Sequence, residues 1–241
     1  MNTPAPDSPS PVFGLLPDLS MVDFPGRMAA VLFTAGCNFA CPFCHNALAL
    51  AGPARPGMAW NALDAALAPF RQNWVSAVVI TGGEPTLHPG LPALVRFLRD
   101  RGFAVKLDTN GSRPDILEAL LPALAYVAMD IKCAPDEYPR RVACPPDLLP
   151  AIRRSVDLLK TSPVDYEFRS TVLPGWFPPD AWPAIADWLA GARRYILQPF
   201  IPRPQVLSPA LRTAPETPLP FLQRMHAFFS PRLPTSLRGT F

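Results

Sequence analysis

Six short apolar segments alternate along this chain with segments of helical periodicity, and this alternation restricts its fold more than any other feature. The apolar segments are rich in Val, Ile, Tyr and Phe, and several are apolar at successive positions, as strands covered on both faces are. The expected strands are Ala29–Thr34, Ala77–Thr81, Ala104–Asp108, Tyr126–Ile131, Tyr166–Val172 and Tyr195–Gln198.

Helical periodicity fills the intervals between these strands and predicts one further helix near the end. The expected helices are Trp60–Phe70, Leu91–Arg101, Pro114–Leu121, Leu148–Leu159, Asp180–Ala190 and Pro220–Phe229. Six β/α units in succession predict an α/β fold, a parallel sheet with outer helices. Periodicity leaves open whether the sheet is doubly wound or curved into a partial barrel. Either way, ligands bind at the C-terminal ends of the strands.

The length and composition of the chain fit one domain. With 241 residues and 49% hydrophobic content, it can bury one sizeable core. Residues 1–11 are rich in Pro and Ser and are expected to form a disordered arm, followed by a single domain over residues 12–241. The last forty or so residues, from about 203, match no pattern that we recognise. The 34 prolines are spread along the chain and are expected to start helices and stiffen loops.

Charge and hydropathy argue against two classes of partner. The net charge of +3 comes without a Lys/Arg run, so no nucleic-acid partner is expected. The longest apolar run, Met28–Phe33, is too short to cross a membrane, and residues 1–11 do not resemble a signal peptide. We therefore expect a cytoplasmic protein whose cysteines are reduced.

Three cysteines follow the first expected strand as Cys37, Cys41 and Cys44, in a C-x3-C-x2-C pattern. Structural zinc sites take four ligands, usually in two separated pairs, and no second pair is present. His45 directly follows Cys44 and is badly placed as a fourth ligand. Three thiolates fit a four-iron cluster better, with one iron left open for a substrate. The alternative is three ordinary buried cysteines.

This loop, with Phe43 before its third cysteine, resembles the signature of the radical S-adenosylmethionine superfamily. The resemblance implies a partial (β/α)6 TIM-like barrel whose three cysteines hold a [4Fe-4S] cluster. The open iron binds the amino and carboxylate groups of S-adenosylmethionine. One electron then cleaves the sulfonium bond, which gives a 5′-deoxyadenosyl radical that abstracts hydrogen.

Polar residues lie at the ends of three later strands. Gly82, Gly83 and Glu84 resemble the family motif that contacts the methionyl amino group; the glycines permit close backbone approach, and the carboxylate accepts from an ammonium. The segment Asp108-Thr109-Asn110-Gly111 ends the third strand; without the resemblance it is an ordinary polar turn. In Asp130-Ile131-Lys132, strand alternation puts the two charged side chains on one face, where a surface salt bridge is the alternative.

The D-T-N-G and D-x-K segments are similar to those of glycyl-radical-enzyme activases. That resemblance implies that Asp108, Thr109 and Asp130 hold a monovalent cation beside the S-adenosylmethionine carboxylate, for which oxygen ligands are suited. It further implies that Lys132 reaches the carboxylate, with Arg169 a further candidate.

Among these activases, the chain most resembles the anaerobic ribonucleoside-triphosphate reductase activating proteins. The resemblance rests on Val22–Gly26, on the Cys-His-Asn end of the loop and on the later segments. Such a protein removes hydrogen from a glycine of a glycyl radical enzyme and takes electrons from flavodoxin or ferredoxin.

Two alternatives stay open. One is a radical enzyme for a small molecule, such as a deazapurine precursor, although that group has Asp-Thr where this chain has His45-Asn46. The other is a non-catalytic, metal-stabilised binding protein. Cys133 and Cys144 are interpreted as incidental.

Overall fold

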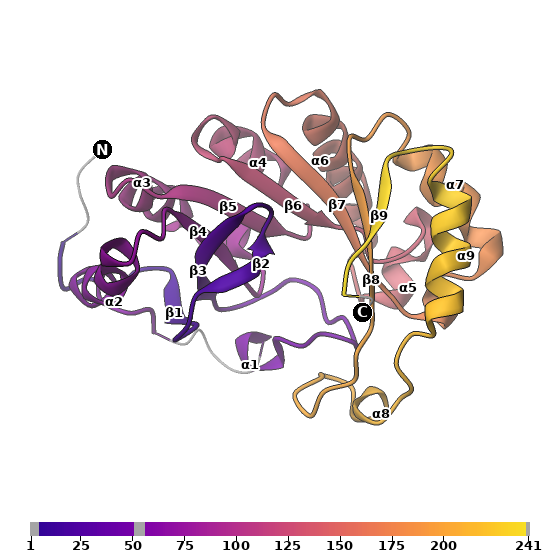
Figure 1. Ribbon diagram of the computed structural model, residues 1–241, viewed down its shortest axis with the longest axis horizontal. Helices are drawn as coiled ribbons and strands as arrows, with labels where there is room; N and C mark the ends of the chain where they lie inside the picture. The colour runs from indigo at the N-terminus through magenta and orange to yellow at the C-terminus, as the bar shows by residue number, and fades with distance from the viewer. Residues whose placement is uncertain (1–4, 51–55, 240–241) are drawn as a thin grey trace. The chain divides into compact units, whose positions relative to one another are not determined.

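The computed structural model describes residues 5–50 and 56–239 (Figure 1). Its strands are β1 Val12–Leu15, β2 Ser20–Phe24, β3 Arg27–Thr34, β4 Ala77–Gly82, β5 Ala104–Thr109, β6 Tyr126–Asp130, β7 Asp165–Val172, β8 Tyr195–Pro199 and β9 Thr235–Leu237. Its α-helices are α1 Ala47–Leu50, α2 Trp60–Gln72, α3 Leu91–Asp100, α4 Pro114–Leu120, α5 Tyr138–Arg141, α6 Leu149–Thr161, α7 Trp182–Trp188, α8 Pro209–Arg212 and α9 Leu219–Phe229.

Contacts along the chain group into two compact units, which we describe separately. The first unit comprises Met1–Asn38, Ala49–Thr109 and Asp115–Val127. The second unit comprises Phe39–Leu48, Asn110–Pro114 and Ala128–Phe241. Because β6 contributes residues to both units, the single domain expected from the sequence stays a prediction.

The first unit is built on the parallel strands β3, β4 and β5, with β1 and β2 both paired antiparallel to β3. The register places Thr34 opposite Gly82, so β3 and β4 end at the same level. The start of β6 lies beside β5, because the Ala125 amide, just before β6, donates to the Val105 carbonyl of β5 at 2.8 Å. This alignment brings the chain segments that follow β3 and β4 close together.

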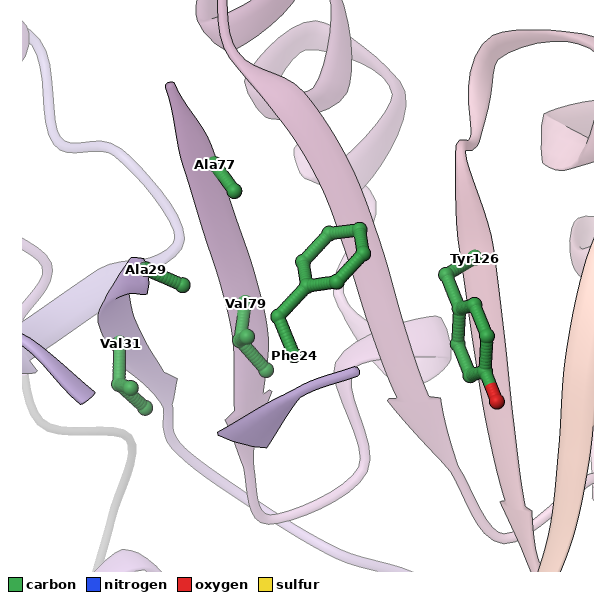
Figure 2. Close-up of a cluster of buried hydrophobic side chains, with 6 residues drawn as sticks. All are labelled: Phe24, Ala29, Val31, Ala77, Val79 and Tyr126. Atoms are coloured by element: carbon green, nitrogen blue, oxygen red, sulfur yellow. The ribbon is translucent and has the colours of Figure 1, made fainter. Parts of the chain in front are cut away.

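Side chains from both faces of these strands are buried. One hydrophobic cluster contains side chains from alternate positions of β3 and β4, which pack with an aromatic ring from β2 and another from β6 (Figure 2). Its members are Phe24, Ala29, Val31, Ala77, Val79 and Tyr126. The rings of Phe24 and Tyr126 lie 5.8 Å apart between centroids. Leu32 and Ile80, on the opposite face, are also wholly buried. The expectation of strands covered on both faces is confirmed for β3 and β4.

The second unit contains β7, β8 and β9 in parallel, with the end of β6 beside β7 through an Ile131 amide bonded to the Arg169 carbonyl at 2.8 Å. The last forty residues supply β9 and α9, which lie beside β8 (Figure 1). Phe229 of α9 packs on Tyr195 of β8, with ring centroids 5.2 Å apart. This C-terminal segment is therefore a structural part of the second unit.

The predicted fold class, a mostly parallel α/β sheet with helices, is confirmed. All six expected strands and all six expected helices are present, with ends that differ by a few residues. Prolines occupy the first turn of several helices, as predicted, because that position needs no amide hydrogen.

The sequence did not predict β1, β2 or β9, which are short strands. In the predicted arm, residues 1–4 lie outside the described residues, and residues 5–11 are hydrogen-bonded to the rest of the chain, among others through the Asn61 amide and the Pro6 carbonyl at 3.0 Å. Ser10 is buried, with 2% of its surface exposed, and its amide donates to the Met58 carbonyl at 2.8 Å. No helix among the described residues is long and apolar enough to span a membrane.

Candidate active site

The cysteine loop leaves the end of β3 through Gly36, which has a positive φ of 84°. The Cys44 amide donates to the Cys41 carbonyl at 3.0 Å and closes a tight turn within the loop. Cys41 is buried, whereas Cys37 and Cys44 are partly exposed, and none of the three is in a disulfide. Cys37 belongs to the first unit, and Cys41 and Cys44 belong to the second.

In the first unit, the turn after β4 is bonded to the chain that enters this loop. The Gly83 amide donates to the Thr34 carbonyl at 2.9 Å, and the Glu84 amide donates to the Gly36 carbonyl at 2.8 Å. A Cβ on Gly83 would lie 1.9 Å from the Gly36 carbonyl oxygen. The two glycines thus permit close approach of another chain segment, and their predicted contact with a ligand stays a prediction.

Glu84 is buried, and its carboxylate is fixed by hydrogen bonds at the ends of β4 and β5. One oxygen, Oε1, accepts from the Thr86 amide at 3.1 Å, from the Thr86 hydroxyl, and from the Thr109 hydroxyl at 2.7 Å. These bonds orient a negative charge in a place that is 1% exposed. An oriented carboxylate of this kind can accept from an ammonium group.

The structure adds a residue that sequence analysis missed, Lys106. Its ammonium nitrogen donates to Asp108 Oδ1 at 2.6 Å, and the Lys106 side chain is wholly buried. Alternation along β5 places both side chains on one face of the strand. The signal was present in the sequence, because a lysine inside an apolar strand is rarely buried without a partner.

In the second unit, Asp130 lies between two cationic side chains. Lys132 Nζ donates to one carboxylate oxygen and Arg169 Nε to the other, each at 2.7 Å. Burial opposes the charge on Asp130, but Arg169 and Lys132 outweigh it and hold the pKa of this carboxyl well below its usual range. Asp130 likewise raises the pKa of Lys132 against the effect of burial. The three groups carry a net charge of +1, which suits an anionic ligand.

Asn110 takes part in a polar turn, which the sequence analysis gave as the alternative to a binding role. Its side-chain oxygen accepts from the Ser112 amide at 2.9 Å, an Asx turn. The following Gly111 has a φ of 77°, and its carbonyl accepts from the Ser155 hydroxyl at 2.7 Å. The visible role of Asn110 in the second unit is therefore to shape the turn after β5.

The part of the cysteine loop in the second unit contacts the predicted residue Lys132 and also segments that the sequence did not point to. The Phe43 ring meets Trp176 edge to face at 5.0 Å and has Lys132 Nζ 5.8 Å from its centre. The Leu207 amide donates to the Cys44 carbonyl at 3.0 Å, and the Ser208 amide donates to the Pro42 carbonyl at 2.9 Å. We call residues 200–208, which follow β8, the strap.

His45 also joins the loop to the strap. Its ring stacks on Phe200 at 5.8 Å with 6° between the planes, and its Nε2 lies 2.8 Å from the Ile201 carbonyl oxygen. Cys133 and Cys144 are buried in the same unit, and burial raises the pKa of both thiols. That environment agrees with their interpretation as small apolar residues.

Three cysteines on one loop, none of them in a disulfide and two of them partly exposed, fit a cluster that is bound by thiolates. Among the residues that the structure describes, no three His, Cys, Asp or Glu side chains gather around the place of a single metal ion. A four-iron cluster binds each thiolate through a different iron atom, so its ligands lie farther apart than those of a single ion.

The predicted monovalent cation fits these residues poorly. Asp108 is bonded to Lys106, and Asp130 is bonded to Lys132 and Arg169, so a cationic side chain is in place at both carboxylates. The Thr109 hydroxyl donates to Glu84. A bound cation would be repelled by the ammonium and guanidinium groups at these ligands.

Comparison with known proteins gives one family. The model described as "Radical SAM superfamily" matches residues 31–188. A Methanocaldococcus jannaschii protein named "Putative glycyl-radical enzyme activating enzyme MJ1227" is 35% identical over 196 residues, 77% of this chain and 78% of that protein. The 7-carboxy-7-deazaguanine synthase of Aquifex aeolicus is 36% identical over 77 residues, 32% of this chain and 33% of that protein.

Among solved structures, Streptococcus suis SuiB bound to S-adenosylmethionine superposes with a TM-score of 0.64 at 14% identity, over 84% of this chain and 48% of that one. The chain thus spans about half the length of SuiB, and the two share a fold. The C-x3-C-x2-C loop, the family match over residues 31–188 and this shared fold agree. The chain belongs to the radical S-adenosylmethionine superfamily, a family of enzymes that use a [4Fe-4S] cluster and S-adenosylmethionine.

Proposed function

We propose that this chain is a glycyl-radical-enzyme activase, whose substrate is a backbone glycine in another enzyme. The observation that carries the proposal is the similarity, over 77% of the chain, to a protein named as an activating enzyme of this kind. The partner that fits best is an anaerobic ribonucleotide reductase or an enzyme similar to pyruvate formate-lyase, because the resembling segments belong to that group of activases.

In this proposal Cys37, Cys41 and Cys44 hold the [4Fe-4S] cluster. When bound and reduced, the cluster supplies one electron that cleaves S-adenosylmethionine into methionine and a 5′-deoxyadenosyl radical, which takes hydrogen from the glycine. The cysteine loop presents the partly exposed thiols of Cys37 and Cys44, and the buried Cys41 lies in the turn that the Cys44 amide closes.

The remaining predicted residues bind the methionyl end of S-adenosylmethionine in this proposal. Glu84, oriented by Thr86 and Thr109, accepts from the ammonium, and the turn of Gly82 and Gly83 places Glu84 against the chain that enters the cysteine loop. A separate group in the second unit, with a net charge of +1, suits the carboxylate: Lys132 and Arg169 donate, while Asp130 holds both side chains in position. Asp108 and Asn110 shape the end of β5.

The proposal includes the cellular setting. A reduced cluster and free thiols require a reducing compartment, so we place the protein in the cytoplasm with a low-potential flavodoxin or ferredoxin as electron donor.

A radical enzyme for a small molecule is the second candidate. Its support is the 36% identity to a 7-carboxy-7-deazaguanine synthase, which extends over 32% of the chain. His45 and Asn46 after the third cysteine differ from the Asp-Thr of that group, and the longer similarity favours the activase.

The test begins with anaerobic reconstitution using iron and sulfide, reduction, and addition of S-adenosylmethionine. We expect 5′-deoxyadenosine by chromatography and none from Cys41→Ala. The glycyl radical enzyme of the same host is then added, and electron paramagnetic resonance should show a glycyl radical only when all components are present. Production of 5′-deoxyadenosine that never yields this signal, but rises with a deazapurine precursor, would favour the second candidate. A protein that binds zinc and makes no 5′-deoxyadenosine would contradict both.

A further inference from the structure

We propose that Lys106 is a positioning residue that supplies the positive charge at Asp108, so that S-adenosylmethionine binds to this protein without a monovalent cation. The proposal rests on the proposed function insofar as Asp108 lies beside the S-adenosylmethionine site. It departs from what the resemblance to activases implies, namely a cation held by Asp108, Thr109 and Asp130.

The contact is short and internal to one strand. Lys106 and Asp108 are two positions apart in β5, and Nζ lies 2.6 Å from Oδ1. The Lys106 side chain has no exposed surface, and that of Asp108 is 10% exposed. An ammonium removed from water to this extent requires a partner, since an unpaired buried charge is strongly unfavourable. The pair is therefore a fixed part of the first unit.

The ion pair changes what Asp108 can bind. A cation at this carboxylate would lie close to a buried ammonium, with little water between them to screen the repulsion. The ammonium also neutralises the charge that would attract the cation. Lys106 thus has the effect of a cation that is covalently attached to the protein.

The other two predicted ligands are also hydrogen-bonded to groups of the protein. Thr109 gives its hydroxyl hydrogen to Glu84 at 2.7 Å, in the same unit as the Lys106–Asp108 pair. In the second unit, Asp130 accepts from Lys132 and from Arg169. Each of the three residues therefore has a function in hydrogen bonding that does not involve an added ion.

The first measurement uses the reconstituted wild-type protein. S-adenosylmethionine affinity is determined by equilibrium dialysis in sodium, potassium and tetramethylammonium chloride at one ionic strength; the last cation is too large for a site of this kind. We expect dissociation constants that agree within about twofold. Affinity that is more than about fivefold higher in sodium or potassium, and saturable in that ion, would overturn the proposal.

The second measurement removes the ammonium. In Lys106→Met, Asp108 keeps its charge, so S-adenosylmethionine affinity should become dependent on sodium or potassium by about tenfold. The double variant Lys106→Met/Asp108→Asn lacks both charges and is the matched control, with no dependence expected. Circular dichroism checks that each variant is folded. If Lys106→Met does not fold, the wild-type result still decides.

The unfolding temperature of the cluster-free protein gives a readout that needs neither S-adenosylmethionine nor catalysis. Sodium or potassium should raise it in Lys106→Met relative to tetramethylammonium, and should leave it unchanged in the wild type. A specific rise in the wild type would contradict the proposal. If the glycine partner is never oxidised, but binding and unfolding are independent of the cation, the activase proposal fails and the assignment of Lys106 remains.

Discussion

At the scale of single residues, Gly82 and Gly83 have a structural function inside the protein, whereas their contact with a ligand stays a prediction. The motif predicts glycines that leave room for a ligand. In the structure the room is taken by the protein itself: a Cβ on Gly82 would lie 2.3 Å from the Thr34 carbonyl oxygen, and one on Gly83 would lie 1.9 Å from that of Gly36. The motif therefore couples the end of β4 to the entry of the cysteine loop.

Gly83→Ala tests that coupling. The added methyl group would push against backbone atoms, which cannot move as a flexible side chain can, so we expect a loss of about 2–3 kcal/mol in the free energy of unfolding. Urea denaturation measures it. Gly14→Ala is the matched control, because a Cβ at Gly14 has nothing within 4 Å; its effect should stay within about 0.5 kcal/mol. Equal effects of the two substitutions would refute the argument.

Asp64 offers a residue-scale test of electrostatics away from the site. It accepts from Arg101 at 2.8 Å and from Arg71 at 2.9 Å, which links α2 to the residue after α3. The hydrogen bond from Arg101 is the main reason that the pKa of Asp64 falls to about 2. The side chain is 37% exposed, so solvent screening limits its contribution to about 0.5–1 kcal/mol.

We therefore expect Asp64→Asn to lower the free energy of unfolding by that amount at pH 7. A lowered folded-state pKa stabilises the protein above the unfolded-state pKa, near 4, and the effect disappears as the pH falls through about 2. The difference between wild type and variant should fall to roughly half at pH 3. Urea denaturation at both pH values measures it, with Asp18→Asn, at an exposed loop position, as the control. A difference that is independent of pH would contradict this account.

At the scale of elements, the cysteine loop is held by contacts from the strap. Two backbone hydrogen bonds reach Pro42 and Cys44, and His45 stacks on Phe200 while its Nε2 meets the Ile201 carbonyl oxygen. Groups that orient the ligands of a metal site commonly change metal affinity by 10-fold to 100-fold when removed. His45 is next to Cys44, a cluster ligand in the proposed function, so its contacts should affect how firmly a cluster is held.

His45→Ala should release iron from the reconstituted protein to a chelator about tenfold faster than the wild type. The absorbance of the chelator complex measures the rate. His226→Ala is the matched control, because its Nε2 also meets a backbone carbonyl oxygen, that of Thr235 at 3.1 Å, but does so between α9 and β9. Its iron release should equal that of the wild type. Similar release rates in all three proteins would mean that the strap does not support the cluster.

At the scale of the whole molecule, features with strong local patterns were predictable and those that depend on distant pairing were not. The strands β3 to β8 were predicted because their apolar runs are continuous, and the cysteines because they lie within eight residues. The three-residue strand β9 has no such pattern; its place depends on pairing with β8. Likewise, the strap gains its significance only from its hydrogen bonds to the loop. Lys106 is a different case, because its partner Asp108 is two positions away in the same strand and the local signal was overlooked.

The C-terminal end illustrates how such pairing stabilises the second unit. Arg238, just after β9, donates to both oxygens of Glu167 in β7, at 2.7 and 2.6 Å, and the Glu167 side chain is wholly buried. Arg238→Met removes this guanidinium from a buried carboxylate, so we expect a loss of about 3 kcal/mol in the free energy of unfolding.

Urea denaturation followed by circular dichroism measures this loss. Adding Glu167→Gln to Arg238→Met should recover part of it, because a neutral amide needs no counter-charge. Arg224→Met, on α9, is the control and should change stability by less than about 0.5 kcal/mol, because its guanidinium carbon lies 5.6 Å from the centre of the Phe221 ring of the same helix. If Arg238→Met is as mild as this control, the terminal residues add little to the second unit, and the fold is complete without β9. A large loss that the second substitution partly reverses would instead establish the final segment, in which the sequence shows no motif, as a necessary part of the sheet.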